Sequence, residues 1–429
     1  MGLLIKNATL PDGKKTDILV EGNKISGISH SIAAPGAERL DATGKLAIPG
    51  FVNAHTHCAM SLLRGLAEDM ELAEWLSTVR KAEVSLSKKQ AHAGALLSCA
   101  EMIRSGTTCF SDMYFHMDSV ADAAKESGMR AVLGYGMADG GNKKGSRESA
   151  DEKKMKGELS AGEKLVKGLH GKENGRITCS IAPHSLYLCS AELLQKASAL
   201  SGKYAVPLHV HLSETRKEVF DCLQATGRRP AYYLDSLGVL TKRTVAAHCV
   251  WLTKEEVRLL ASKGVSAALN PVCNMKLAGG GCPPVPEMQE FGMNVSLGTD
   301  GPASNNSHSM FEAMKFCSLL VKNSRWDATA AKDSDVFSFA TLGGARALGI
   351  PAGELKEGKL ADIVLLDLKA PNMAPHNSHA ASLAYSAHPG NVTDSVIDGK
   401  IVMRDGEITA FDEEKSVENA GKEAEKLVR

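Results

Sequence analysis

The chain has 429 residues, of which 43% are hydrophobic and 23% are charged, an ordinary composition for a soluble globular protein. This length exceeds what one core of ordinary size accommodates, so we expect one large domain and one smaller domain. Lys plus Arg and Asp plus Glu each total 50, and this balance predicts no general attraction to nucleic acid or to an anionic membrane.

The first segment, MGLLIKNATLPDGKK, has only a short apolar stretch and does not resemble a signal peptide. No apolar run approaches the roughly 20 residues that are needed to cross a bilayer. None of the ten cysteines belongs to a CxxC pair, and most of them lie in apolar segments. We therefore expect a cytoplasmic protein whose cysteines are reduced core residues.

The two ends of the chain share one pattern, which differs from the pattern of the middle. Residues 1–48 and 358–410 contain short runs that alternate apolar and polar residues, such as TDILVEG and ADIVLLDL, with turn pairs between them. We expect both ends to combine in one small β-sandwich domain. Residues 411–429 are predicted to form a charged terminal helix.

Residues 49–357 alternate apolar strand-like runs with helical stretches. The helical stretches include ELAEWLSTVRKAE and SVADAAKESG, the second of which ends in Gly128, a typical helix stop. Eight strands that alternate with helices predict an α/β fold of the TIM-like (β/α)8 barrel type. The eight runs are KLAIPGFVNA, TTCFSDM, RAVLGYG, RITCSIAP, VPLHVHL, TVAAHCV, GVSAALN and MNVSLGTD.

Polar residues gather at the ends of these predicted strands, where a (β/α)8 barrel places its chemistry. They are far apart in sequence, but the barrel topology would bring them to one mouth. The residues are His55 and His57 after the first strand, His184 after the fourth, His211 and Glu214 at the fifth, His248 on the sixth and Asp300 after the eighth.

This set of residues predicts a catalytic metal site. His55 and His57 are two residues apart, so on a strand their imidazoles point the same way and can reach one ion. His211 and Asp300 would complete three nitrogen ligands and one oxygen ligand. One position stays open for water, which is the pattern of catalytic sites rather than of closed structural ones.

Each of these residues alone has a simpler explanation. A lone histidine at a strand end is more often structural, and His209 is expected to point into the barrel below the site. On the HxH pair alone, a metal site and a purely structural role are about equally expected. Asp300 alone would fit a helix N-cap, and Glu214 alone would fit an exposed carboxylate. The prediction therefore depends on their joint arrangement at three separate strand ends.

The sequence also resembles a known family. PGFVNAHTH, SLLRGLAEDMELAEWL, HLSET, AAHC, NPVCNMKLAGG and LGTDGPASNN are similar to the motifs of the amidohydrolase superfamily. Within it, the resemblance is to the branch that deaminates 5'-methylthioadenosine, S-adenosylhomocysteine and 5'-deoxyadenosine. It extends over nearly the whole chain, and it implies one divalent metal per subunit, usually Zn²⁺, although Fe²⁺ or Mn²⁺ would also suit three imidazoles and a carboxylate.

The resemblance also implies roles for individual residues. By position, His55, His57, His211 and Asp300 match the metal ligands. His248 matches the histidine that orients the nucleophilic water, and Glu214 matches the carboxylate that moves protons. Three further residues match substrate contacts, with the first on the ribose hydroxyls: Glu83, His184 and Arg147.

One position departs from the pattern. Relatives that handle S-adenosylhomocysteine can carry a second arginine where this chain has Tyr135. Two arginines suit the amino-acid carboxylate through charge-assisted pairing, whereas one arginine and a tyrosine suit it less. We therefore hypothesise that several 5'-substituents are accepted and that uncharged ones are favoured. The alternative is that Tyr135 only packs.

The expected reaction is the hydrolysis of a 5'-modified adenosine, or of adenosine, to the inosine analogue and ammonia. Asp300 and His248 would orient the activated water and accept its proton, and Glu214 would protonate N1 of the purine. The fourth predicted strand, RITCSIAPHS, contains no Lys that could bridge two metals, which favours a single ion. Three alternatives remain open: a guanine substrate, a chlorotriazine substrate, and a non-catalytic barrel scaffold. Assembly into a homo-oligomer is plausible but has no motif behind it.

Overall fold

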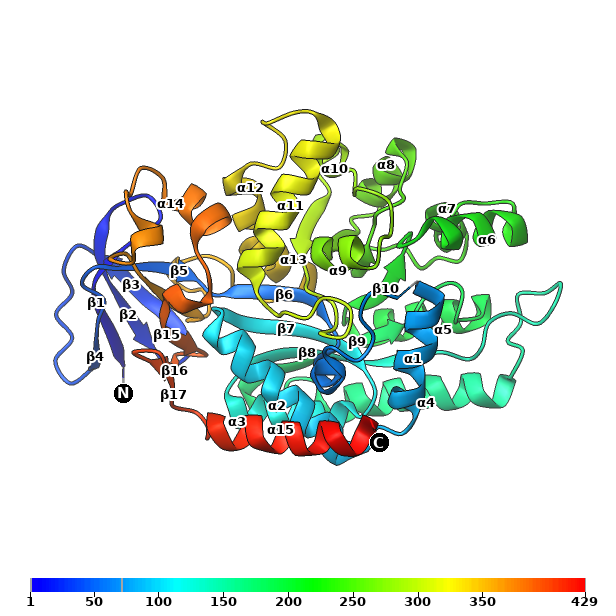
Figure 1. Cartoon of the computed structure of the whole chain (residues 1–429), viewed down its shortest axis with the longest axis horizontal. Coiled ribbons are helices and arrows are strands. Elements are labelled where there is room, and N and C mark those ends of the chain that lie inside the picture. Colours follow the sequence, from blue (N-terminus) through cyan, green and yellow to red (C-terminus); the bar gives the residue numbers. More distant parts are fainter. Residues whose placement is uncertain (1, 71, 429) are drawn as a thin grey trace.

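A computed structural model describes residues 2–70 and 72–428 and divides them into a barrel and a separate mixed sheet (Figure 1). Eight parallel strands in chain order form the nearly closed barrel. Each predicted run in the middle of the chain contains one of them, which confirms the (β/α)8 prediction. The barrel strands are β6 (Phe51–Thr56), β7 (Thr107–Tyr114), β8 (Arg130–Met137), β9 (Ile177–Pro183), β10 (Leu208–Leu212), β11 (Thr244–His248), β12 (Ser266–Leu269) and β13 (Asn294–Leu297).

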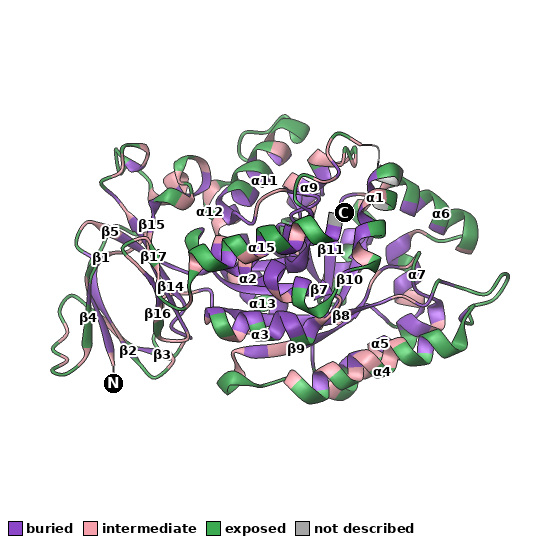
Figure 2. Cartoon of the chain, turned by 60° about the horizontal axis from the view of Figure 1, so that its bottom comes forward, coloured by how far each residue is buried: buried purple, intermediate pink, exposed green. Residues whose placement is uncertain are grey.

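Helices surround the barrel, and the strands lie buried beneath them (Figure 2). All five residues of β10 are buried, as expected for a parallel strand that is covered on both faces. The helices are α1 (Leu72–Val84), α2 (Lys88–Arg104), α3 (Met117–Ser127), α4 (Glu152–Leu169), α5 (Ala191–Tyr204), α6 (Arg216–Thr226), α7 (Pro230–Ser236), α8 (Lys254–Ser262), α9 (Pro271–Lys276), α10 (Val285–Glu290), α11 (Met310–Arg325), α12 (Asp333–Ser338), α13 (Gly344–Leu348), α14 (His379–Ala381) and α15 (Glu413–Val428).

Both ends of the chain contribute to the second sheet, as the sequence predicted. Hydrogen bonds join its strands in the order β17-β16-β15-β14-β5-β1-β2-β3, with β4 paired to β1. Its strands are β1 (Leu3–Thr9), β2 (Lys15–Glu21), β3 (Lys24–Ser29), β4 (Glu38–Asp41), β5 (Lys45–Pro49), β14 (Ile363–Asp367), β15 (Val392–Ile397), β16 (Lys400–Arg404) and β17 (Glu407–Ile408).

The chain passes from this sheet into the barrel at Gly50. The apolar run KLAIPGFVNA, which we predicted as one strand, is in fact two strands: β5 in the mixed sheet and β6 in the barrel. A Cβ atom on Gly50 would lie 2.2 Å from the side chain of Thr108, so only glycine fits where the two strands meet.

The first and last barrel strands are joined by side chains as well as by backbone. The Asn53 amide donates to Thr299 Oγ1 at 2.8 Å, and the Thr299 N–H donates to Asn53 Oδ1 at 3.1 Å. The N–H groups of Thr299 and Asp300 both donate to the carbonyl of His55. These bonds bring the end of β6 beside the segment that follows β13, where two groups of site residues meet.

Two further features agree with the sequence. All ten cysteines are free thiols, and nine of them are buried. Within the part of the chain that the structure describes, no helix has both the length and the apolarity that crossing a bilayer requires.

Candidate metal centre and active site

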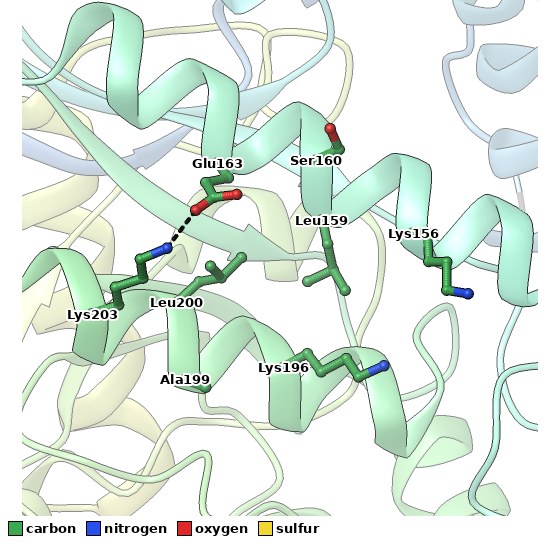
Figure 3. A pocket seen from close by; sticks show the side chains of 8 residues that line it. All are labelled: Lys156, Leu159, Ser160, Glu163, Lys196, Ala199, Leu200 and Lys203. Atoms are coloured by element: carbon green, nitrogen blue, oxygen red, sulfur yellow. Dashed lines mark hydrogen bonds and ion pairs between the residues drawn. The ribbon is translucent and has the colours of Figure 1, made fainter.

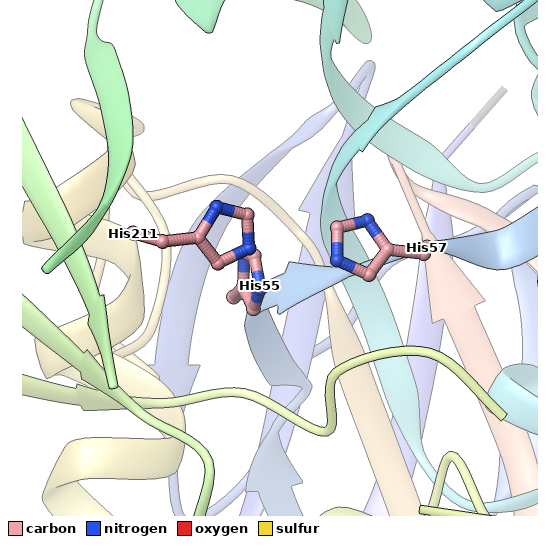
Figure 4. A group of neighbouring side chains, drawn as sticks. All are labelled: His55, His57 and His211. Carbon is pink, nitrogen blue, oxygen red and sulfur yellow. The ribbon is translucent and has the colours of Figure 1, made fainter. Parts of the chain in front are cut away.

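Three histidines meet at the C-terminal mouth of the barrel (Figure 4). His55 lies at the end of β6, His57 follows this strand, and His211 lies on β10. One nitrogen from each lies within 4.8 Å of the others, and all three residues are buried. The spacing of two residues therefore does bring both histidines of the HxH pair to one point, which the third histidine reaches from across the barrel.

Backbone carbonyls fix the orientation of two of these rings. The Nδ1–H of His57 donates to the Met113 carbonyl at 2.6 Å, and the Nδ1–H of His211 donates to the His184 carbonyl at 2.7 Å. Because a carbonyl only accepts, both rings carry a proton on Nδ1, and Nε2 is the nitrogen that an ion can take in place of a second proton. This is the arrangement that prepares an imidazole to bind a metal.

His55 is held from below by a second histidine. Its Nδ1 lies 3.0 Å from Nε2 of His209, and Nδ1 of His209 lies 3.2 Å from Ser111 Oγ. If Nε2 of His55 is the ligand atom, each Nδ1–H donates to the next group, and the chain ends at the serine hydroxyl. His209 is buried inside the barrel. Sequence reasoning did not anticipate that it would touch a residue of the site.

Asp300 places one carboxylate oxygen among the histidines and turns the other away. Its Oδ1 lies 3.1 Å from Nε2 of His57 and 3.5 Å from Nε2 of His55. Its Oδ2 accepts hydrogen bonds from Cys273 Sγ at 2.7 Å and from Ser304 Oγ at 3.0 Å. Asp300 has a positive φ of 61°, a strained conformation that is typical of functional positions. One oxygen is thereby left for a ligand or a proton.

The cluster fits a divalent cation. Nε2 of His55 is buried and has no hydrogen-bond partner, which is costly unless something else satisfies it. Burial opposes a charge on His57, but the Asp300 carboxylate overrides this effect and raises the pKa of His57 to about 9. Nitrogen and carboxylate donors that converge around an unsatisfied nitrogen are the ligand types of Zn²⁺, Fe²⁺ and Mn²⁺.

Glu214 and His248 lie beside this cluster. Burial is the main cause that raises the pKa of Glu214 to about 7, with His211 opposing and Asp300 adding to the shift. Oε2 of Glu214 lies 3.9 Å from Nε2 of His248. The ring of His248 stacks on His211 with centroids 5.2 Å apart. A proton-carrying carboxyl and an imidazole therefore face the same space as the metal ligands.

The other nitrogen of His248 accepts hydrogen bonds. The Asn274 amide lies 3.0 Å from its Nδ1, and the Asn270 amide lies 3.4 Å from it. Asn270 also donates from the same nitrogen to the carbonyl of Ala268, which identifies that nitrogen as a donor. His248 consequently carries its proton on Nε2 and presents a hydrogen-bond donor to the site.

The three predicted substrate contacts differ in position. His184 stacks on His211 with centroids 4.4 Å apart, and its Nδ1 is buried without a partner. Glu83, on α1, accepts a hydrogen bond at 2.8 Å from Tyr114, whose ring lies 6.0 Å from that of His57. Arg147 is exposed on the loop between β8 and α4, and no contact in the described structure joins its side chain to the histidines.

Tyr135 lies on β8 and packs against the main core. Burial raises the pKa of its hydroxyl, and the nearby carboxylate of Glu158 on α4 raises it further. The hydroxyl of Tyr135 thus has an acid as its neighbour.

Sequence reasoning missed several residues that support the site. Their side chains form contacts between elements that are distant in sequence, and no motif reveals such contacts. They are His209, Ser111, Tyr114, Asn270, Cys273, Asn274 and Ser304.

A surface pocket between α4 and α5 does not belong to this site (Figure 3). Leu159 and Leu200 line it together with lysines that form ion pairs with glutamates, such as Lys203 with Glu163 at 2.8 Å. None of the histidines described above lines this pocket.

Comparisons with known proteins agree with the geometry. Residues 46–402 match the model of the amidohydrolase family. The 5'-deoxyadenosine deaminase of Methanothermobacter thermautotrophicus is 46% identical over 96% of this chain and 95% of its own. The 5'-deoxyadenosine deaminase of Methanocaldococcus jannaschii is 45% identical over 97% of this chain and 98% of its own.

Solved structures of similar shape also exist. An adenosine deaminase from Xanthomonas campestris with bound zinc superposes with a TM-score of 0.91 at 31% identity, over 99% of this chain and 98% of that one. An atrazine chlorohydrolase from Arthrobacter aurescens, in complex with zinc, has a TM-score of 0.90 at 22% identity, over 98% of this chain and 100% of that one. At that identity, the second match shows the fold alone.

Proposed function

The chain belongs to the amidohydrolase family and is a hydrolytic deaminase, and we propose that it converts 5'-deoxyadenosine to 5'-deoxyinosine and ammonia. The observation that carries the proposal is the convergence of His55, His57, His211 and Asp300 beside a buried Glu214. The names of its similar relatives point to the substrate. Because the chain is a hydrolytic deaminase, it is not a non-catalytic scaffold, which the sequence alone had left as an alternative.

We propose one divalent ion per chain, with zinc favoured and Fe²⁺ or Mn²⁺ as alternatives. The Nε2 atoms of His55, His57 and His211 and one oxygen of Asp300 would hold it. The sequence and the structure offer no lysine on β9 to bridge a second ion. When bound, such an ion supplies hydroxide as a nucleophile near neutral pH.

The side chains of the site divide the proton transfers between them. Asp300 is placed to accept the proton of the attacking water, because it is the only carboxylate among the proposed ligands and hydrogen bonds from Cys273 and Ser304 fix its orientation. His248 donates from Nε2 and therefore orients the water or the new C6 oxygen rather than accepting a proton. We thus assign proton acceptance to Asp300 alone.

Glu214 would deliver the proton that makes the purine ring reactive. Attack at C6 pushes charge onto N1, and a carboxyl with a pKa near 7 is partly protonated at neutral pH and can donate there. The N1–H bond forms as the carboxyl O–H bond breaks. Glu214 then takes the proton that Asp300 received and passes it to the departing amine as the C6–N bond breaks. The proton of the new C6 hydroxyl is released as the carbonyl forms and returns through Asp300 to Glu214, so the acid is regenerated.

Three residues would bind the rest of the nucleoside. Glu83 would accept hydrogen bonds from the ribose hydroxyls, and the unpartnered Nδ1 of His184 is available to the substrate. Arg147 would need to move with its exposed loop to reach a ligand. The preference for an uncharged 5'-substituent rests on the sequence, in which Tyr135 stands where a second arginine would pair with a carboxylate.

The substrate is tested by measuring ammonia release from adenosine, 5'-deoxyadenosine, 5'-methylthioadenosine, S-adenosylhomocysteine, guanine and cytosine. We expect 5'-deoxyadenosine to have the highest kcat/KM, with 5'-methylthioadenosine near it. A higher kcat/KM for S-adenosylhomocysteine would contradict the preference for uncharged groups. Activity on guanine but on no adenosine would replace the proposed substrate by another aminated heterocycle.

A further inference from the structure

A second glutamate lies directly behind the segment that carries Glu214. Glu218 is in the first turn of α6 and is only 4% exposed. Its Oε1 accepts the N–H of Ser213 at 2.9 Å, and its Oε2 accepts the N–H of Glu214 at 2.8 Å. Both carboxylate oxygens therefore hold the backbone from which the proton donor projects, and the reaction steps derived above do not use this acid.

The backbone that Glu218 holds is strained. Ser213 has a φ of 51°, which is unfavourable for a non-glycine residue and persists only where the surroundings enforce it. Its carbonyl accepts hydrogen bonds from the N–H groups of Val250 and Trp251, at 3.1 and 2.9 Å. The segment is thus fixed by the loop after β11 on one side and by Glu218 on the other.

A comparison within the chain shows that this arrangement is unusual for a helix cap. Glu256 is the third residue of α8, and its carboxylate reaches back to the N–H of the N-cap residue Thr253, which is the ordinary capping box. Glu218 is the third residue of α6, but it reaches past the N-cap Thr215 to the two residues before it. The same helix position therefore holds the active-site segment in one case, whereas in the other it caps its own helix and pairs with Arg229 at 2.8 Å.

We propose that Glu218 is a positioning residue that sets the Glu214 carboxyl for proton transfer to the substrate. It acts through the backbone of residues 213 and 214 and does not touch the reacting atoms. This inference rests on the proposed function, because it assigns to Glu214 the transfer of the proton to N1.

The test is Glu218→Gln in the metal-loaded, full-length protein, assayed with 5'-deoxyadenosine. Glutamine keeps the volume and one carbonyl oxygen, but it sets an NH₂ group against a backbone N–H. We expect kcat to fall roughly tenfold to a hundredfold, since small displacements of catalytic groups have effects of this order. KM and bound metal should stay at wild-type values, and in a Glu214→Gln background the substitution should add no further loss.

Glu256→Gln is the matched control, because it also weakens a buried glutamate at the third position of a helix. It should lower Tm while leaving kcat unchanged. Wild-type kcat in Glu218→Gln would overturn the proposal, and so would a loss of kcat that only follows loss of metal or equals the loss in Glu256→Gln. If Glu218→Gln does not fold, Glu218→Asp is judged by the same criteria, because it keeps the carboxyl group but withdraws it from the backbone.

A wrong substrate assignment would give a different result from a wrong role of Glu218. If wild-type protein releases ammonia from another heterocycle but not from 5'-deoxyadenosine, the substrate assignment falls. Glu218→Gln is then measured with that heterocycle, and the same comparison of kcat, KM and metal content decides whether Glu218 positions Glu214.

Discussion

At the scale of single residues, a change at Glu214 tests the proposed proton transfer separately from metal binding. The substitution Glu214→Gln keeps the size of the side chain but removes the proton that N1 needs. We expect the variant to bind its metal normally and to lose nearly all turnover, at least roughly a hundredfold in kcat. Metal analysis and ammonia release on the same preparation would check this. Full activity would remove Glu214 from the mechanism.

His209 offers a second prediction at this scale. Because its Nε2 accepts the Nδ1–H of His55 and Ser111 continues the chain, it should fix the His55 ring, a proposed metal ligand. We expect His209→Ala to weaken metal affinity by roughly tenfold to a hundredfold, measured by competition with a chelator. Ser111→Ala removes only the outer link, so its effect should be smaller. Wild-type affinity in His209→Ala would show that the contact is incidental.

At the scale of elements, strand β7 holds helix α1 at the mouth of the barrel. Tyr114, at the end of β7, donates to Glu83 on α1 at 2.8 Å. If Glu83 contacts the ribose, Tyr114→Phe should raise KM for adenosine by about tenfold, the effect of losing a hydrogen bond to a charged group. The matched substrate is 2',3'-dideoxyadenosine, which lacks the hydroxyls in question. An equal increase in KM for both nucleosides would contradict this role.

The sequence was most informative about which strands and helices form. The alternation of apolar runs and helices predicted eight barrel strands, because parallel strands that are buried on both faces must be apolar throughout. It did not separate β5 from β6, since the apolar run continues through Gly50 while the backbone leaves one sheet for the other. Strand boundaries of this kind depend on tertiary packing against Thr108, which a single sequence does not show.

The residues of the candidate site also differ in whether the sequence could predict them. His55, His57, His211 and Asp300 could be predicted to meet, because barrel topology brings strand ends together whatever the loops do. The groups that orient them could not be predicted. Cys273 on α9, for example, reaches Asp300 from 27 residues earlier in the chain, and the tautomer of His248 depends on a neighbouring amide.

At the scale of the whole molecule, a buried ion cluster joins the barrel to the mixed sheet. Arg130 on β8 forms two bonds to Asp362, of 2.8 and 3.1 Å, and one of 2.9 Å to Asp398. Because Arg130→Met would leave two acids without their partner, we expect a loss of about 3–5 kcal/mol in the free energy of unfolding. Lys254→Met breaks an exposed pair with Glu290 and a contact with the Phe291 ring, and it should change little. Denaturant titration of both variants would check this, and equal stabilities would contradict it.

Metal removal is the decisive experiment, because it tests whether an ion held by the histidine cluster is needed for deamination. The protein is stripped with a chelator, and ammonia release from 5'-deoxyadenosine is measured before and after stepwise addition of Zn²⁺. We predict that the stripped protein is inactive and that activity returns in proportion to zinc, reaching its plateau at one ion per chain. Full deamination by the metal-free protein would contradict the account.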